Sequence, residues 1–586
     1  MKSLLRLVPY LRRYTRPLLW GLCTVVLSNL FTVATPLFVG RAIDVLKNGL
    51  EAGRLEGADL ALYAGLVVGF ALVAGIFTFL TRQTIIVTSR HIEFDMRNDF
   101  LAHIQKLSLP FFQNTPTGDL MAHATNDISA VRNALGPGIM YPTDTLMTFT
   151  MVLGVMLYQD WQLTLLALVP LPFVSLAVYR LGKLVHQKFE ERQAKYSELT
   201  TRAQENLSGI RVVKAYVREQ YEIGLFRDLS WDYLKKNLVL ARVQSIMWPL
   251  MFLLVGFSLI LTLYFGGVRV IEGRLTIGTL TAFFGYLVML IWPMIAFGWV
   301  INILQQGSAS MVRLAKILDT EPEIRDTDIT DRTISAILGE IEFRDVSFRH
   351  NNTPQDTLSG ITLKVPSGTT LAIVGYTGAG KSTLVNLLPR LLDVTGGELL
   401  IDGTDIRRIP LAVLRSNIGY VPQETFLFSE TIAENITYGT DGGNEQRIRE
   451  AAEISQLAKD VAEFPQDFQT VLGERGITLS GGQKQRTSIA RAVMRKPRIL
   501  ILDDALSAVD TFTEEEILKR LRTIMRNRTS IIISHRISTV KDADMIIVLH
   551  EGRITERGRH DQLVSKDGIY ASLHRKQLLE DEIEHL

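Results

Sequence analysis

Six long segments with no charge, or a single one, constrain this chain more than any other feature of its sequence. They cover residues 17–40, 60–81, 134–159, 161–179, 243–268 and 275–304. A helix crosses the hydrocarbon core of a bilayer with about 20 apolar residues, so each segment is close to or beyond spanning length. Buried helices of a large soluble protein would be the alternative, but six such segments in succession argue against it. The sequence therefore predicts six membrane-spanning helices.

Basic residues ahead of the first span predict its orientation. Lys2, Arg6, Arg12, Arg13 and Arg16 all precede residue 17, and loops rich in Lys and Arg remain on the cytoplasmic side of a membrane. The N-terminus is therefore expected in the cytoplasm, and six spans return the second half of the chain to the same side. The net charge of +2 gives no electrostatic case for a nucleic-acid partner.

Two connections between the spans are long and carry charges at helical spacing, over residues 82–133 and 180–242. We expect the membrane helices to continue into the cytoplasm as amphipathic extensions. The breaks at Thr115–Gly118 and Ser208–Gly209 are the expected turning points. These features predict an all-α transmembrane domain over residues 1–312 and a linker over residues 313–340. Short apolar strands alternate with amphipathic helices from residue 341 to 586, which is typical of an α/β domain.

The segment LAIVGYTGAGKSTL at Leu371–Leu384 carries the most specific chemical signal. An apolar strand precedes the pattern Gly-x4-Gly-Lys-Ser and a helix follows it, which is the setting of a phosphate-binding loop. The helix N-terminus favours an anion, Lys381 is expected to reach the terminal phosphates, and Ser382 is expected to coordinate magnesium. The residues of this loop expected to bind a nucleotide are Gly375, Thr377, Gly378, Ala379, Gly380, Lys381, Ser382 and Thr383.

A second apolar strand, in ILILDDALSAVD at Ile499–Asp510, delivers two adjacent carboxylates. Asp503 is the expected distal magnesium ligand. The phosphate loop, Gln423, LSGGQ at Leu479–Gln483, this acidic strand and His535 follow one another in an order that resembles the nucleotide-binding domain of ABC transporters. Six spans ahead of one ATPase domain resemble the exporter type of that family (type IV, multidrug-resistance-like), and the resemblance covers essentially the whole chain.

The resemblance implies that two ATPase domains close head to tail around two ATP molecules. Each ATP would be held by the phosphate loop of one chain and by Ser480, Gly481 and Gly482 of the other, and magnesium by Ser382, Gln423 and Asp503. His535 would contact the γ-phosphate. The other residues implied at the nucleotide are Gln483, Asp510 and His350. Glu474–Gly476 would meet the partner's cytoplasmic loops, which would touch the ATPase domains near Thr115–Asp119 and Arg211–Tyr216.

Two positions depart from the family pattern. His350 stands where an aromatic ring usually stacks on adenine, and an imidazole offers less area. Asp504 stands where the family usually has a glutamate that polarises the attacking water. Aspartate is one methylene shorter, roughly 1.5 Å less reach, and a misplacement of about 1 Å can cost on the order of a hundredfold in rate. Asp504, His535 and Gln423 form the expected catalytic set, and a small backbone shift would let Asp504 act as a modest base.

An intact LSGGQ beside an altered Asp504 suits a heterodimer whose partner supplies the glutamate for the working site. The leading expectation is one half of an ATP-driven exporter of amphipathic or hydrophobic substrates, multidrug or lipid-like, in a bacterial inner membrane. A homodimeric lipid or peptide exporter and an ATP-gated regulator or channel are the alternatives. Asp144 is a lone carboxylate within a span; it marks either a site for cationic amphiphiles or a hydrated position paired with Thr143 or Thr145.

Overall fold

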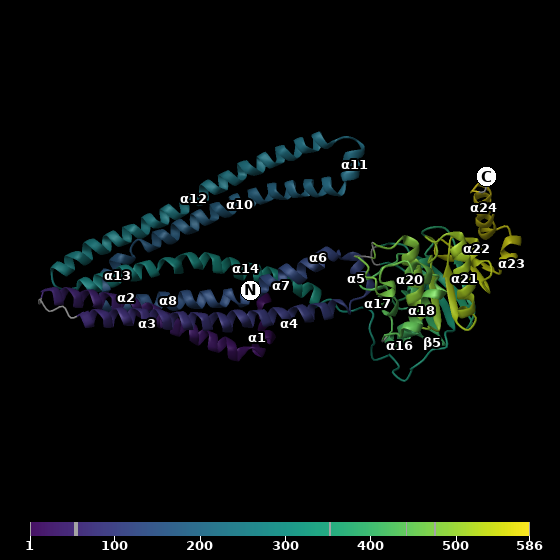
Figure 1. The fold of residues 1–586 in the computed structure, drawn as a ribbon, viewed down its shortest axis with the longest axis horizontal. Helices are drawn as coiled ribbons and strands as arrows, with labels where there is room; N and C mark the ends of the chain where they lie inside the picture. Colours follow the sequence, from purple (N-terminus) through teal and green to yellow (C-terminus); the bar gives the residue numbers. More distant parts are fainter. Residues whose placement is uncertain are drawn as a thin grey trace. The chain divides into compact units, whose positions relative to one another are not determined.

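The chain divides into two compact units, seen in a computed structural model that describes residues 2–51, 57–350, 353–440, 442–473, 476 and 478–584 (Figure 1). Unit 1 comprises residues 1–104 and 118–319, and unit 2 comprises residues 105–117 and 320–586. A short segment of the first half, residues 105–117, therefore belongs with the second half.

Unit 1 is built from helices wherever the structure describes its secondary structure. The chain enters through η1 (Lys2–Leu7) and α1 (Val8–Arg13). The longer helices are α2 (Thr15–Glu51), α3 (Gly57–Thr81), α4 (Val87–Ile104), α8 (Pro137–Gln159), α10 (Leu171–Ser208), α12 (Glu219–Ile271), α13 (Ile277–Met289) and α14 (Ile291–Leu318). The shorter ones are η2 (Arg82–Ile86), α6 (Thr117–Ala122), η3 (His123–Asp127), α7 (Ile128–Leu135), α9 (Trp161–Leu168) and α11 (Ile210–Ala215).

Four helical stretches in the described part of the chain are long and apolar enough to cross a membrane. They are Thr15–Glu51, Leu60–Ile104, Glu219–Ile271 and Ile277–Leu318. The expected third span is α8, whose hydropathy is lowered by Asp144 and several threonines. The expected fourth span is divided between α9 and α10 at Val169–Pro170, because proline removes a backbone donor from the helix. The total of six spans stays a prediction.

The expected helical extensions and their breaks are present, and their cytoplasmic location stays a prediction. Helix α3 continues through the π-helical turn η2 into α4, and α6 begins at Thr117 inside the expected break. Helix α10 ends at Ser208, and the short α11 separates it from α12. Gly209 lies between α10 and α11, where a glycine lowers the cost of leaving the helix.

Close helix contacts in unit 1 depend on small residues and internal hydrogen bonds. A Cβ atom added to Gly278 of α13 would lie 2.0 Å from the carbonyl oxygen of Gly40 in α2, so the two backbones touch there. The Gly278 N–H donates to Asp44 at 2.7 Å. Tyr286 of α13 is fully buried and donates its hydroxyl to the carbonyl oxygen of Val33 at 3.0 Å. These contacts fix α13 against α2.

Asp144 pairs with an amide rather than with a neighbouring hydroxyl. Its Oδ1 accepts from Nδ2 of Asn29 in α2 at 2.8 Å, and Oδ1 of Asn29 accepts from Thr148. The expected pairing with Thr143 is wrong, because that hydroxyl donates to the carbonyl oxygen of Ile139 at 2.9 Å. Thr145 Oγ1 is buried without a partner. The network ties α8 to α2.

Unit 2 contains two sheets. A four-stranded antiparallel sheet has the order β2-β1-β4-β5 and a six-stranded, mostly parallel sheet has the order β10-β9-β3-β8-β7-β6. The strands are β1 (Ile341–Phe348), β2 (Leu358–Val365), β3 (Thr370–Val374), β4 (Gly396–Ile401), β5 (Thr404–Asp405), β6 (Ile418–Val421), β7 (Ile499–Asp503), β8 (Thr529–Ile533), β9 (Met545–His550) and β10 (Arg553–Gly558).

Helices and the four-stranded sheet pack against the six-stranded sheet, so its central strands are buried on both faces. Ile501 and Ile531 point into one apolar cluster, while Leu502 and Ile532 point into another, which explains why β7 and β8 read as continuous apolar runs. The helices of unit 2 are α5 (Leu109–Asn114), α15 (Lys381–Asn386), α16 (Leu411–Ser416), α17 (Ile432–Thr437), α18 (Glu445–Ile454), α19 (Ala458–Val461), α20 (Gly481–Met494), α21 (Thr511–Met525), α22 (Ile537–Val540), α23 (His560–Ser565) and α24 (Ile569–Glu584).

Candidate nucleotide-binding site

Four neighbouring strands bring the sequence motifs to one edge of the six-stranded sheet. Strands β3, β8, β7 and β6 pair in parallel in that order, and ligands bind beyond the carboxyl ends of such strands. Strand β3 leads into Gly375, β7 ends at Asp503, His535 follows β8 and Gln423 follows β6. The topology thus explains why motifs more than a hundred residues apart in the sequence meet.

Glycines of the phosphate loop are needed for different reasons, as Gly375 and Gly378 show. Gly375 has φ +150°, and a Cβ atom there would lie 2.2 Å from the carbonyl oxygen of Leu549. Gly378 has φ +82° with open space around it, so its requirement is the left-handed backbone alone. The loop therefore needs glycine at both places, at Gly375 for space and at Gly378 for the backbone conformation.

Lys381 is held inside its own loop. Its Nζ donates to the carbonyl oxygen of Gly375 at 2.8 Å and to that of Tyr376 at 3.0 Å. Burial lowers the pKa of the Lys381 ammonium, and the nearby Asp503 and Asp504 act in the opposite direction. The side chain is thus a pre-positioned cation at the start of α15, where a phosphate would also meet the helix N-terminus.

Asp503 and Ser382 form an oxygen pair suited to a hard cation. Asp503 is only 2% exposed, and its Oδ1 accepts from Ser382 Oγ at 3.2 Å. Burial raises the pKa of Asp503, the Ser382 hydrogen bond opposes that rise, and the charge of Asp504 adds to it. A buried carboxylate with a raised pKa gains from a divalent cation, and Mg²⁺ prefers such oxygen ligands. The residues present therefore fit magnesium.

A cavity of about 310 Å³ joins these groups. The expected site residues that line it are Thr377, Gly378, Gly380, Lys381, Ser382, Thr383, Gln423, Asp503, Asp504 and His535. Thr357 and Ile533 also line it and were not expected from the sequence. Ile533 ends β8 at the same edge of the sheet, so the strand order could have identified it. Thr357 lies in no motif, and nothing in the sequence marks it.

Asp504 occupies a backbone conformation that suits aspartate. Its φ is +49°, in the left-handed region where Asp and Asn are several-fold enriched over other non-glycine residues. Its N–H donates to the carbonyl oxygen of Ile533 at 3.0 Å, and its carbonyl oxygen accepts from Ser507 Oγ at 3.0 Å. The carboxylate is therefore carried on a tightly held turn.

Gln485 holds that turn and was missed from the sequence. This buried side chain of α20 donates to Ser507 Oγ at 3.0 Å and to the carbonyl oxygen of Asp504 at 3.4 Å. It accepts from the Ala508 N–H at 2.9 Å. Because its partners lie about twenty residues further along the chain, only its place in LSGGQKQR marks it.

Other expected nucleotide residues lie outside this cavity. Ser480 caps α20 through a reciprocal capping box with Gln483, so Gly481 and Gly482 open a helix whose N-terminus can attract an anion. Asp510 caps α21 by accepting from the Thr513 N–H at 2.9 Å. The implied contact of Ser480–Gln483 with the partner's nucleotide stays a prediction. Of Glu474–Gly476, residues Glu474 and Arg475 lie outside the described residues.

His350 packs against a neighbouring ring and not against the phosphate cavity. Its ring lies edge-on to Phe348, with the ring centroids 4.8 Å apart. It lines a second cavity of about 320 Å³ together with Pro110, Gln113 and Asn114 from α5. Ser108 Oγ, just before α5, accepts from the Ile324 N–H at 2.9 Å. The residue expected to stack on adenine therefore borders a segment of the first half of the chain.

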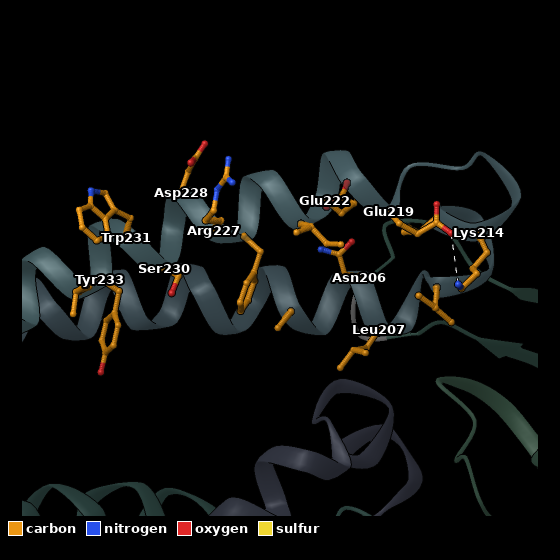
Figure 2. Close-up of a pocket in the computed structure, with 16 residues that line it drawn as sticks. Asn206, Leu207, Lys214, Glu219, Glu222, Arg227, Asp228, Ser230, Trp231 and Tyr233 are labelled. Atoms are coloured by element: carbon orange, nitrogen blue, oxygen red, sulfur yellow. Dashed lines mark ion pairs between the residues drawn. The ribbon is translucent and has the colours of Figure 1, made fainter.

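A larger cavity, of about 1100 Å³, lies within unit 1 between α10, α11 and α12 (Figure 2). Its lining is mostly apolar and includes Leu207, Ile223 and Trp231. Lys214 and Glu219 close its end with an ion pair at 3.6 Å. Val212 and Tyr216, inside the segment expected to contact an ATPase domain, are 61% and 75% exposed. The contact of this segment with an ATPase domain stays a prediction.

Comparison with known proteins covers both units. Residues 18–294 match the family described as ABC transporter transmembrane region, and residues 358–507 match the family described as ABC transporter. The chain is 38% identical over 557 residues to the "Probable multidrug resistance ABC transporter ATP-binding/permease protein YheI" of Bacillus subtilis, covering 94% of this chain and 93% of that protein.

Two further relatives and one solved structure show the same extent. The chain is 35% identical over 581 residues to the "Multidrug resistance-like ATP-binding protein MdlA" of Escherichia coli, covering 99% and 97% of the two chains. It is 35% identical over 559 residues to the "ATP-dependent lipid A-core flippase" of Syntrophus aciditrophicus, covering 95% and 92%. The structure of a bacterial Atm1-family ABC exporter with ATP bound matches with a TM-score of 0.79 at 28% identity, over 97% of this chain and 98% of that one.

Proposed function

Because the chain belongs to the ABC transporter family and is an ATP-driven exporter with its membrane and ATPase domains in one polypeptide, we propose that it works as half of a heterodimer. The substrates are amphipathic or hydrophobic molecules of the multidrug or lipid-like class. The ATPase domain and the N-terminus lie in the cytoplasm, and the membrane is the bacterial inner membrane. The names of the multidrug-resistance relatives support this substrate class.

One observation carries the heterodimer proposal: the cavity is complete except for the reach of one carboxylate. Lys381, Ser382 and Asp503 stand ready for phosphates and magnesium, and His535 borders the same cavity. Of the two positions that depart from the family pattern, only Asp504 lines this cavity, and its side chain is one methylene short. ATP at this site is therefore bound and hydrolysed slowly or not at all.

The intact segments of the chain then serve the partner. Ser480–Gln483 form a capped helix start and complete the partner's site, where the partner supplies a glutamate opposite its own ATP. Lys381 and the loop amides would orient the phosphates of this chain's ATP, and His535 would contact the γ-phosphate. Ser382, Gln423 and Asp503 would hold Mg²⁺, which would supply positive charge to neutralise the phosphates. Slow hydrolysis here keeps the two ATPase domains together while the partner's site turns over.

A homodimeric lipid exporter is the second candidate. The relative named as a lipid A-core flippase, at 35% identity over 95% of this chain, favours it. In that case Asp504 would act as a modest base in two equal sites.

Vectorial transport tests the proposal directly. The chain is reconstituted in proteoliposomes alone and with a candidate partner half-transporter, and ATP-dependent accumulation of a fluorescent amphiphile or a labelled lipid is recorded. We expect accumulation only with the partner, and its loss when the partner's glutamate is replaced. Accumulation by the chain alone would support the homodimer, and a conductance without accumulation would contradict export.

A further inference from the structure

The C-terminal helix α24 reaches back to the segment that carries His535. Oε1 of Gln577 accepts from the N–H of Ile537 at 2.7 Å, and Nε2 of Gln577 donates to the carbonyl oxygen of His535. One amide group thus binds the backbone on both sides of Arg536. Both of its hydrogen-bonding functions are used, so the side chain has a defined orientation.

Buried contacts fix the part of α24 from which Gln577 projects. Tyr570 is fully buried in an apolar cluster that also contains Ile537 of α22, and Leu573 packs against that cluster. Positions 570, 573 and 577 lie on one face of a helix. Glu556 of β10 accepts from the N–H groups of Ile569 and Tyr570 at the start of the helix, where a negative charge is favourable. Gln577 is therefore presented from a firmly anchored element.

The same segment is tied down from its other side by Glu514. This buried carboxylate in the first turn of α21 accepts from Arg536 and from Thr539 Oγ1. Within the described residues, the His535 imidazole has no hydrogen-bond partner of its own. Its direction into the cavity beside Lys381 and Asp504 therefore depends on how its backbone is held.

We propose that Gln577 is a positioning residue for His535, setting the backbone from which the imidazole meets the terminal phosphate of ATP. The inference rests on the proposed function, in which His535 contacts the γ-phosphate. It gives the C-terminal helix a part in telling ATP from ADP, because only ATP carries the group that His535 would touch.

The test compares ATP and ADP affinity of the full-length chain in lipid nanodiscs, by displacement of a fluorescent nucleotide. We expect Gln577→Ala to weaken ATP binding about three- to tenfold, because the hydrogen bond from His535 to the γ-phosphate would be lost. ADP binding should be unchanged. Gln577→Glu keeps the acceptor for Ile537 but places a carboxylate against the carbonyl of His535, so an equal or larger loss is expected. Leu578→Ala, on the exposed side of the same turn, is the control and should change neither affinity.

A variant lacking the imidazole separates this inference from the function on which it rests. His535→Ala should lower the preference for ATP, and adding Gln577→Ala to it should cause no further loss. If His535→Ala leaves the preference unchanged, the proposed γ-phosphate contact fails and the inference fails with it. If His535→Ala lowers the preference while both Gln577 variants retain it, or lose ATP and ADP affinity equally, Gln577 is only structural and the proposal is overturned.

Discussion

Asp503 is buried beside Lys381, and this makes the stability of the ATPase domain depend on pH. Burial raises the pKa of Asp503 above its ordinary value of 3.8. Between the ordinary and the raised pKa the folded chain holds a proton that the unfolded chain has lost, so stability falls as the pH rises through that interval. The buried carboxylate of Asp503 thus lowers the stability of the nucleotide-free chain and favours the binding of a cation.

A neutral side chain at position 503 should remove this dependence. Without nucleotide or magnesium, Asp503→Asn is expected to raise the melting temperature relative to wild type, and by more at about pH 8 than at about pH 4. Thermal unfolding at both pH values measures the difference. A stabilisation that is the same at both, or absent at the higher pH, would contradict the account of Asp503.

His350 is the second residue whose chemistry limits the site. Tyrosine at this position would offer a larger ring to adenine, and aromatic pairs contribute about 0.5–1.5 kcal/mol beyond area burial. We expect His350→Tyr to strengthen ATP binding about two- to tenfold and His350→Ala to weaken it, measured by nucleotide displacement. If neither substitution changes the affinity, adenine stacks on another ring, such as the half-exposed Tyr376.

Among the structural elements, α20 both opens toward the partner's site and supports this chain's own. Its buried Gln485 holds Asp504, Ser507 and Ala508 through three hydrogen bonds. Gln485→Ala removes these hydrogen bonds, and a typical hydrogen bond contributes about 0.5–1.5 kcal/mol to stability. We expect a loss of that size in the free energy of unfolding, together with slower ATP turnover.

Chemical denaturation of matched variants checks this role. Gln485→Glu keeps the acceptor for Ala508 but loses both donors, so it should fall between wild type and Gln485→Ala. Gln446→Ala, an exposed glutamine of α18, should change the unfolding free energy by less than about 0.5 kcal/mol. Equal effects of Gln485→Ala and Gln446→Ala would refute the assignment.

The sequence predicted those elements whose signal is local. Strands β3 and β7 are continuous apolar runs, and the glycines of the phosphate loop predict its left-handed backbone conformations. The break between α9 and α10 was missed although Pro170 and Pro172 mark it, because the surrounding residues are uniformly apolar. Contacts of single polar residues with distant partners, such as Gln577 with His535 or Asn29 with Asp144, leave no pattern in the sequence. They could be identified only from the structure.

At the scale of the whole chain, the two compact units carry different features. Unit 2 holds a nearly complete nucleotide site, and unit 1 holds the long apolar helices. The segment Leu109–Asn114 of the first half packs with unit 2 beside His350. Helix α11 carries exposed apolar residues, and its contact with an ATPase domain stays a prediction.

The central claim is that Asp504 makes this chain's site slow and that a partner provides the working one. Its most direct test is steady-state ATPase activity of the chain purified alone in lipid, beside Asp504→Glu and the control Lys381→Ala. We expect the wild type to be close to the Lys381→Ala background and Asp504→Glu to be at least about tenfold faster, since restoring about 1 Å of reach can recover a large factor in rate. Turnover of a few per second by the wild type, within the ordinary range of enzymes, with no gain from glutamate, would contradict the claim and make the chain a homodimer.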